Sequence, residues 1–350
     1  MKYIIVICSI AILYFIALGG IITSRKTEKS TFFSMDQTNW LRSIAILMIM
    51  FSHYYRLIGL DYSDGILSLC FSFGFIGVAV FFILSGYSLM ISKLNKPNYL
   101  KGFLKKRIIR LYIPFLIVYL LDVIIILIMG KELIWSDFIF MPFLSLPGTV
   151  NWYLKVQLGL YIIFYIVAKL VKKDTKIIIV TSCICFLYMI IGLFSGIDVH
   201  WYEGVFAFPL GMFVAKYKEA IFNFIYNKFI LYFCFSTFVF VMCFVPFFVW
   251  GGSVFEILYI YGCVQFIACI CCKVSGSPKN KAFTYLGVIS LELYLVHTVL
   301  QNTIFKAIGI QNQTTVIGLV SFFAFVFFSI IISAIVKKAN DRISNMLLKS

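Results

Sequence analysis

Long apolar segments separated by short polar gaps run through almost the whole chain. Most contain about 18 to 22 residues, the length that an α-helix needs to cross a hydrocarbon core. The segments, about eleven in number, lie at 3–23, 40–59, 69–91, 109–129, 152–171, 177–194, 202–216, 229–249, 254–272, 285–303 and 315–336. The pattern predicts an all-α fold, a polytopic transmembrane helix bundle with a ten-helix core and one extra N-terminal helix.

The same pattern divides the chain into three parts. Residues 1–35 are expected to form the extra transmembrane helix and a cytoplasmic linker, residues 36–340 the main membrane domain, and residues 341–350 a cytoplasmic tail. The first segment ends in Arg25-Lys26 without a small-x-small exit, so we interpret it as a retained helix and not as a cleaved signal peptide. The polar gaps are too short to bury a core of their own.

Composition agrees with a membrane protein. Hydrophobic residues make up 62% of the chain and charged residues 13%, and the mean hydropathy is +1.02, far from the averages of soluble proteins. The net charge of +16 does not indicate nucleic-acid binding, because the lysines and arginines occupy short gaps and form no single basic face.

Lysine and arginine are concentrated in alternate gaps, which gives the chain an orientation. By the positive-inside rule these gaps and the C-terminus are cytoplasmic, whereas the N-terminus lies outside. We therefore expect a multi-pass protein of the cell (plasma or inner) membrane. The ten cysteines lie mostly within apolar segments, without histidines at metal-ligand spacing, so we interpret them as packing residues and predict no metal site or disulfide.

Arg42 and His53 are the first candidates for chemistry. The eleven-residue step between them is about three helical turns, so both side chains lie on one face, roughly 16 Å apart along the axis. Ionisable groups inside a membrane are costly and mark functional sites. An imidazole can take a proton from an attacking hydroxyl and return it to a leaving group; a histidine that merely bonds across a helix interface is the alternative.

Arg107 and Arg110 stand three residues apart at the cytoplasmic mouth of a helix, beside Lys105 and Lys106. Two guanidiniums on one helix face form a good phosphate clamp, and acyl-CoA is a natural cytoplasmic ligand with phosphates. The alternative interpretation is a topology anchor. Small residues at Gly74, Gly77, Ser85 and Gly86 indicate close helix packing when taken alone.

Taken together, these residues resemble the acyltransferase-3 family of integral membrane acyltransferases. The matching positions, in order, are Arg42-x10-His53, Gly77-Val78, Phe81 to Tyr87, Arg107-x-x-Arg110 with Pro114, Asn151 to Leu154, and Leu293 to His297. The resemblance covers about residues 36 to 336. It implies ten membrane helices and transfer of acyl groups, often acetyl, from cytoplasmic coenzyme A to hydroxyls of surface glycans or other extracytoplasmic acceptors.

The resemblance also assigns roles by position. It implies that His53 is the catalytic base or an acyl relay and Arg42 its partner, and that Arg107, Arg110 and Lys106 hold the donor. The cavity wall would include Ser85 and Tyr87, and Trp152 would offer an aromatic surface to a sugar. Ala79 stands where members with a fused esterase-like domain often have aspartate, and no such domain is present, so the chain resembles the stand-alone bacterial type.

A carboxylate that orients His53 would complete a base-orienter pair. The sequence leaves Asp61, Asp64, Glu203 and Glu292 open for this role. Glu292 and His297 lie five residues apart on one segment, at a height that allows them to share the cavity of His53. For His297 an interhelical hydrogen bond that orders the bundle is the favoured interpretation.

The resulting prediction is an O-acyltransferase that moves an acyl group, expected to be acetyl, from acyl-CoA to a glycan or lipid-linked glycan. No permanently bound cofactor is expected. The partners are acyl-CoA, the glycan acceptor and membrane lipids, without nucleic acid. A multi-helix transporter or flippase of a polar substrate is the alternative. The acyl group, the accepting hydroxyl and the oligomeric state are left open.

Overall fold

Helices account for every regular element in the part of the chain that the structure describes. This computed structural model describes residues 29–57, 69–130, 132–139, 145–146, 151–273, 281–305, 309 and 315–349. The predicted segment 3–23, Asp61 and Asp64 lie outside the described residues. The all-α helical bundle that the apolar pattern predicts is confirmed.

Eight helices exceed eighteen residues. They are α2 (Met35–Leu57), α3 (Leu69–Asn95), α4 (Phe103–Ile128), α6 (Trp152–Leu170), α7 (Asp174–Phe194), α10 (Phe229–Trp250), α11 (Ser253–Lys273) and α14 (Thr315–Lys349). The shorter elements are η1 (Lys29–Thr31), α5 (Trp135–Ile139), η4 (Val199–Trp201), α8 (Ala207–Lys216), α9 (Lys218–Asn227), α12 (Lys281–Val288), α13 (Ser290–Val299) and η5 (Leu300–Phe305).

Seven of the described helices are long and apolar enough to cross a membrane, and eight if a bent pair counts as one span. The bent pair replaces the segment predicted at 285–303: α12 and the α13–η5 arm meet at 74°. The segment predicted at 202–216 contains only the ten-residue α8, about 15 Å long. Arg42 and His53 make α2 too polar to be counted among the seven.

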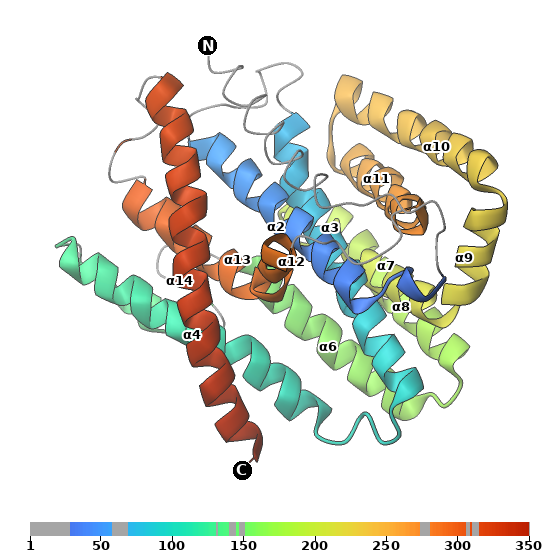
Figure 1. Cartoon of the computed structure of the whole chain (residues 1–350), viewed down its shortest axis with the longest axis horizontal. Coiled ribbons are helices and arrows are strands. Elements are labelled where there is room, and N and C mark those ends of the chain that lie inside the picture. The colour runs from blue at the N-terminus through green and yellow to red at the C-terminus, as the bar shows by residue number, and fades with distance from the viewer. Residues whose placement is uncertain are drawn as a thin grey trace.

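The last helix includes most of the predicted tail. α14 continues as one helix to Lys349, so residues 341–349 of that tail are helical. In Figure 1 the turns between α3 and α4 and between α6 and α7, together with the C-terminal end of α14, lie along the lower edge of the molecule. These are cation-rich gaps, as the charge pattern predicts.

Helix α3 lies at the centre and packs most closely against α2 and α8 (Figure 1). A Cβ added to Gly86 would lie 1.9 Å from the carbonyl oxygen of Phe208, and one added to Gly211 would lie 2.0 Å from that of Ile83. A Cβ on Gly77 would lie 2.7 Å from the carbonyl oxygen of Ala45. The small residues of α3 therefore allow close backbone approach to both neighbours, which is the helix packing that their spacing indicates.

Helices α10 and α11 form a hairpin on one side of this centre (Figure 1). Most of the side chains of α10 are exposed in the chain alone, including large apolar ones such as Phe235, Phe238 and Val249, which suits contact with lipid. The cysteines whose side chains are described are all free.

Candidate active site

His53 of α2 and His297 of α13 form a pair in the middle of the bundle. The Nδ1 atom of His53 lies 3.0 Å from the Nε2 atom of His297, and the two ring centroids are 5.0 Å apart. His297 is fully buried, whereas His53 is partly exposed. The side chain of Gln301 donates to the backbone carbonyl of His53 at 3.0 Å, which ties η5 to the same turn of α2.

The hydrogen bonds of His297 define the position of the protons. Its Nδ1 atom lies 2.8 Å from the carbonyl oxygen of Leu293. A carbonyl oxygen can only accept, so Nδ1 of His297 carries the proton and Nε2 of the neutral ring accepts from Nδ1–H of His53. This leaves the lone pair on Nε2 of His53 available to take a proton or to attack an acyl carbon.

The side chain that is hydrogen-bonded to His53 is therefore a histidine, whereas the candidates from the sequence for an orienting group are carboxylates. Glu292, predicted to share the cavity, is directed toward α14: its Oε1 accepts from Asn340 at 2.8 Å and lies 3.7 Å from Nζ of Lys337. Glu203 pairs with His200. The favoured interpretation of His297 as an interhelical hydrogen bond holds, but its partner is the candidate catalytic residue. One feature of the sequence indicates this pair: both histidines are predicted to lie at a similar height in the membrane.

A cavity of about 160 Å³ opens among α2, α3, α4, α6 and α13. Its polar lining consists of Arg42, Ser85, Ser88, Arg107, Gln157, Tyr153, Tyr161, Ser290 and Tyr294. The cavity brings together Arg42, Arg107 and Ser85, to which the sequence assigns three different roles. His53 is not among the residues that line it.

Two guanidiniums face this cavity. Arg42 donates to Asn39 at 2.8 Å and to Ser88 at 3.3 Å. Arg107 donates to the Tyr99 hydroxyl at 2.6 Å and lies over the rings of Phe103 and Tyr161. Among the described residues, neither arginine belongs to an ion pair. Two cations that lack a carboxylate partner favour an anionic ligand.

Gln157 adds an unused polar atom to the same wall. Its Nε2 donates to the Ser85 hydroxyl at 2.9 Å, whereas its buried Oε1 has no hydrogen-bond partner in the described part of the protein. A buried polar atom without a partner is costly. A ligand with an N–H group would satisfy it.

Tyr294 joins the cavity to the histidine pair. Its ring lines the cavity and lies 5.7 Å from the ring of His297 and 4.9 Å from that of Tyr153. The cavity therefore ends one side chain away from the histidines.

The other predicted residues are not part of the cavity lining. Arg110 and Lys106 are exposed on the same end of α4 as Arg107. The Tyr87 hydroxyl donates to the carbonyl of Phe33 at 2.9 Å and holds η1 against α3. The ring of Trp152, at the start of α6, stacks on His200 at 6.0 Å with an interplanar angle of 20°.

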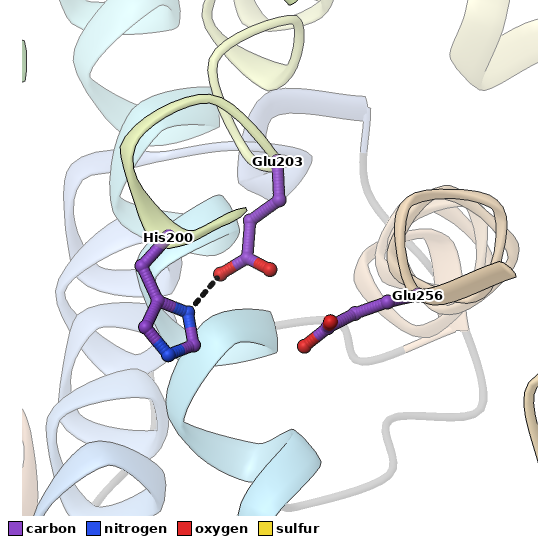
Figure 2. A group of neighbouring side chains, drawn as sticks. All are labelled: His200, Glu203 and Glu256. Carbon is purple, nitrogen blue, oxygen red and sulfur yellow. Dashed lines mark hydrogen bonds and ion pairs between the residues drawn. The ribbon is translucent and has the colours of Figure 1, made fainter. Parts of the chain in front are cut away.

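His200 belongs to a second group of ionisable residues, with Glu203 and Glu256 (Figure 2). Burial lowers the pKa of the His200 imidazole, but the hydrogen bond and the negative charge of Glu203 outweigh it, so that the pKa lies above its usual range. Glu256 lies 53 residues beyond Glu203 in a separate apolar segment, so the sequence alone does not bring it to the other two residues.

A comparison with protein families matches a model described as an acyltransferase domain, that of the acyltransferase-3 family, to residues 35–338. Comparisons with curated proteins and with solved structures give no match. The family match spans all the helices that carry the histidine pair and the arginine-lined cavity. The chain therefore belongs to the acyltransferase-3 family of membrane acyltransferases.

Proposed function

We propose that the protein transfers an acyl group, expected to be acetyl, from cytoplasmic acyl-CoA to a hydroxyl of an extracytoplasmic or lipid-linked glycan. The observation that carries the proposal is the hydrogen-bond chain from Leu293 through His297 to His53, which leaves Nε2 of His53 as a free base. This base stands one side chain away from a cavity lined by two guanidiniums that form no ion pair with any described residue. A base beside an anion site suits acyl transfer from a phosphate-bearing donor.

The donor would occupy the cavity from the cytoplasmic side. A volume of about 160 Å³ is below the range of about 300–1,000 Å³ typical of pockets for drug-sized ligands, so the cavity suits the slender pantetheine arm and not the nucleotide. Arg42 and Arg107 attract the phosphates at its mouth, where Arg110 and Lys106 add positive charge. The free Oε1 of Gln157 would accept an amide N–H of the arm.

The reaction follows from the position of the base. Nε2 of His53 takes the proton of the glycan hydroxyl as its oxygen attacks the thioester carbonyl. The new O–C bond forms, the C–S bond breaks, and the protonated His53 returns the proton to the leaving thiolate. His297 keeps Nδ1 of His53 hydrogen-bonded throughout and stabilises the imidazolium. The same lone pair would attack the carbonyl first if His53 acts as an acyl relay.

The acceptor would approach from the side of Trp152. This indole and the stacked His200 ring lie at the N-terminal end of α6, away from its cation-rich C-terminal end. An aromatic face near the outer rim suits the apolar face of a sugar ring.

The test uses purified full-length protein with labelled acetyl-CoA and a lipid-linked glycan fraction. We expect the wild type to release coenzyme A and label the glycan, and His53→Ala to lose at least about 100-fold of this activity while retaining its melting temperature. Label transfer by His53→Ala at the wild-type rate would refute the assignment. Accumulation of substrate in vesicles without thioester cleavage would support a transporter.

A further inference from the structure

Three ligand-type side chains converge beside Trp152, at the N-terminal end of α6. His200 belongs to η4, Glu203 follows it by three residues, and Glu256 comes from the first turn of α11 (Figure 2). The imidazole Nδ1 of His200 lies 2.9 Å from Oε1 of Glu203. One ligand atom from each of the three residues lies within 4.8 Å of the other two.

Glu203 contributes the observation that points to a ligand. The residue is only 1% exposed, and its second carboxylate oxygen, Oε2, accepts no hydrogen bond from an N–H or hydroxyl group in the described part of the chain; the group that faces this carboxylate is the carboxyl of Glu256. In Figure 2 the carboxylates of Glu203 and Glu256 are directed toward the same space beside the His200 ring. Two carboxylates that share a poorly solvated space repel each other unless a cation or a proton lies between them.

The backbone around the group is fixed in place. The backbone N–H of His200 donates to Asp198 at 3.0 Å, and the Tyr261 hydroxyl donates to the backbone carbonyl of Glu203 at 3.1 Å. Tyr261 lies on α11, as does Glu256. The hydrogen bond therefore holds the η4 segment and α11 together independently of the ionisable side chains, so the backbone that carries the three ligands is fixed.

We propose that His200, Glu203 and Glu256 bind one divalent transition-metal cation such as Mn²⁺ or Zn²⁺. One imidazole nitrogen and two carboxylates form a donor set typical of these ions, with metal–ligand distances of about 2.0 to 2.2 Å. Glu256 is partly exposed, so it can move the short distance needed. The cation neutralises the negative charge of both carboxylates. At least one of its coordination positions remains for a further oxygen ligand.

The site has a consequence at the outer side of the bundle. The cation joins the η4 segment to α11, and Trp152 stacks on the His200 ring that binds it. Cation binding therefore fixes the orientation of Trp152. This consequence rests on the proposed role of Trp152 toward the acceptor, whereas cation binding itself does not.

The test measures Mn²⁺ binding to the full-length protein in detergent after treatment with a chelator. Mn²⁺ is the primary probe because the chain has ten cysteines, whose thiolates would bind Zn²⁺ elsewhere. Loss of the free Mn²⁺ signal in electron paramagnetic resonance gives stoichiometry and affinity without acyl donor or acceptor. We expect one site per chain and a higher melting temperature with Mn²⁺, since a ligand of the folded state stabilises it.

The variants Glu256→Gln and Glu203→Gln should each weaken Mn²⁺ binding at least about tenfold and abolish the Mn²⁺-dependent rise in melting temperature. Glu256 is partly exposed, so Glu256→Gln should fold even if the buried Glu203→Gln does not. Glu219→Gln is the matched control, because Glu219 is an exposed carboxylate paired with Lys29. Its variant should bind Mn²⁺ as the wild type does.

Absence of stoichiometric Mn²⁺ binding would overturn the proposal. A Glu256→Gln protein that binds Mn²⁺ like the wild type would also overturn it. So would a Glu256→Gln protein that is more stable than the wild type when Mn²⁺ changes the melting temperature of neither protein. The last result would mean that the two carboxylates share a proton. Failure of acyl transfer with intact Mn²⁺ binding would refute the proposed function alone.

Discussion

The chemistry of His53 depends on where one proton lies. Because the carbonyl of Leu293 holds the Nδ1 proton of His297, the Nε2 atom of His297 must accept from His53. His297 is thus a positioning residue, which selects the tautomer and the orientation of the His53 ring. In hydrolytic triads a carboxylate has this task. In our proposal a second neutral imidazole, itself oriented by the backbone, has this task instead.

Substitution of His297 tests this role by a matched pair of variants. His297→Gln retains an oxygen that can accept from Nδ1–H of His53, whereas His297→Leu does not. We expect His297→Leu to lose about 100-fold in kcat or more and His297→Gln to be clearly more active than His297→Leu, with similar KM values for acetyl-CoA in both. Steady-state kinetics check this expectation. Equal activity of the two variants would indicate that His297 only fills space.

Arg107 and Arg110 allow a second comparison, since both belong to the predicted clamp but only Arg107 lines the cavity. Arg107→Gln removes one guanidinium from the donor pocket, so KM for acetyl-CoA should rise about tenfold or more, as a charged hydrogen bond contributes about 1.5–3 kcal/mol. Arg110→Gln should raise it less, because exposed charges are screened. Titration of the donor measures both values. A larger effect at Arg110 would move the donor site to the outer face of α4.

At the scale of helices, close backbone contacts hold the site in place. Gly86 of α3 lies against the carbonyl of Phe208, and Gly287 of α12 lies against that of Asn39, where an added Cβ would be 1.9 Å from the oxygen in each case. The first contact seats α3 against α8, and the second seats α12 against the start of α2. The positions of Arg42 and Ser85 depend on these contacts because both residues lie on the helices that they join.

Gly86→Ala should destabilise the protein by about 2 kcal/mol or more, because backbone atoms of α8 would have to move. Gly159→Ala is the control within the same bundle. A Cβ at Gly159 meets nothing within 4 Å, and alanine favours the interior of helix α6 by up to about 1 kcal/mol. Thermal unfolding in detergent compares the two. Equal melting temperatures would show that the α3–α8 contact is looser than the structure indicates.

The sequence predicts the helices better than it predicts their breaks. Apolar length alone locates α3, α4, α6, α7, α10 and α11, because each must face lipid or the bundle over a full span. The 74° bend between α12 and α13 is not visible in hydropathy, since both arms are apolar. Next to the bend, Gly287 lies against Asn39, which is 248 residues away in the sequence, and hydropathy does not reveal such a contact.

For the candidate site, too, the sequence identifies single residues but not the contacts between distant segments. Arg42, His53 and Arg107 are found from the sequence because charge inside an apolar segment is conspicuous. The pairing of His53 with His297 spans 244 residues, and the meeting of Glu256 with His200 joins separate segments. Such contacts follow from tertiary packing, which spacing along one helix does not reveal.

At the scale of the whole molecule, the sites follow one direction through the bundle. The arginine-lined cavity includes Arg107 from the start of α4, next to the lysine-bearing α3–α4 turn, whereas the His200 group contacts Trp152 at the N-terminal end of α6. The histidine pair lies between them, adjoining the cavity through Tyr294. The arrangement supports our proposal that donor and acceptor reach His53 from opposite faces of the membrane.

Sealed membrane vesicles from expressing cells test this central claim most directly. Acetyl-CoA does not cross the bilayer, so inside-out vesicles present the cytoplasmic face to added labelled donor while the glycan stays in the lumen. We predict that wild-type inside-out vesicles acetylate lumenal glycan, whereas right-side-out vesicles and inside-out vesicles with His53→Ala do not. Equal labelling in both vesicle orientations, or undiminished labelling with His53→Ala, would contradict the account.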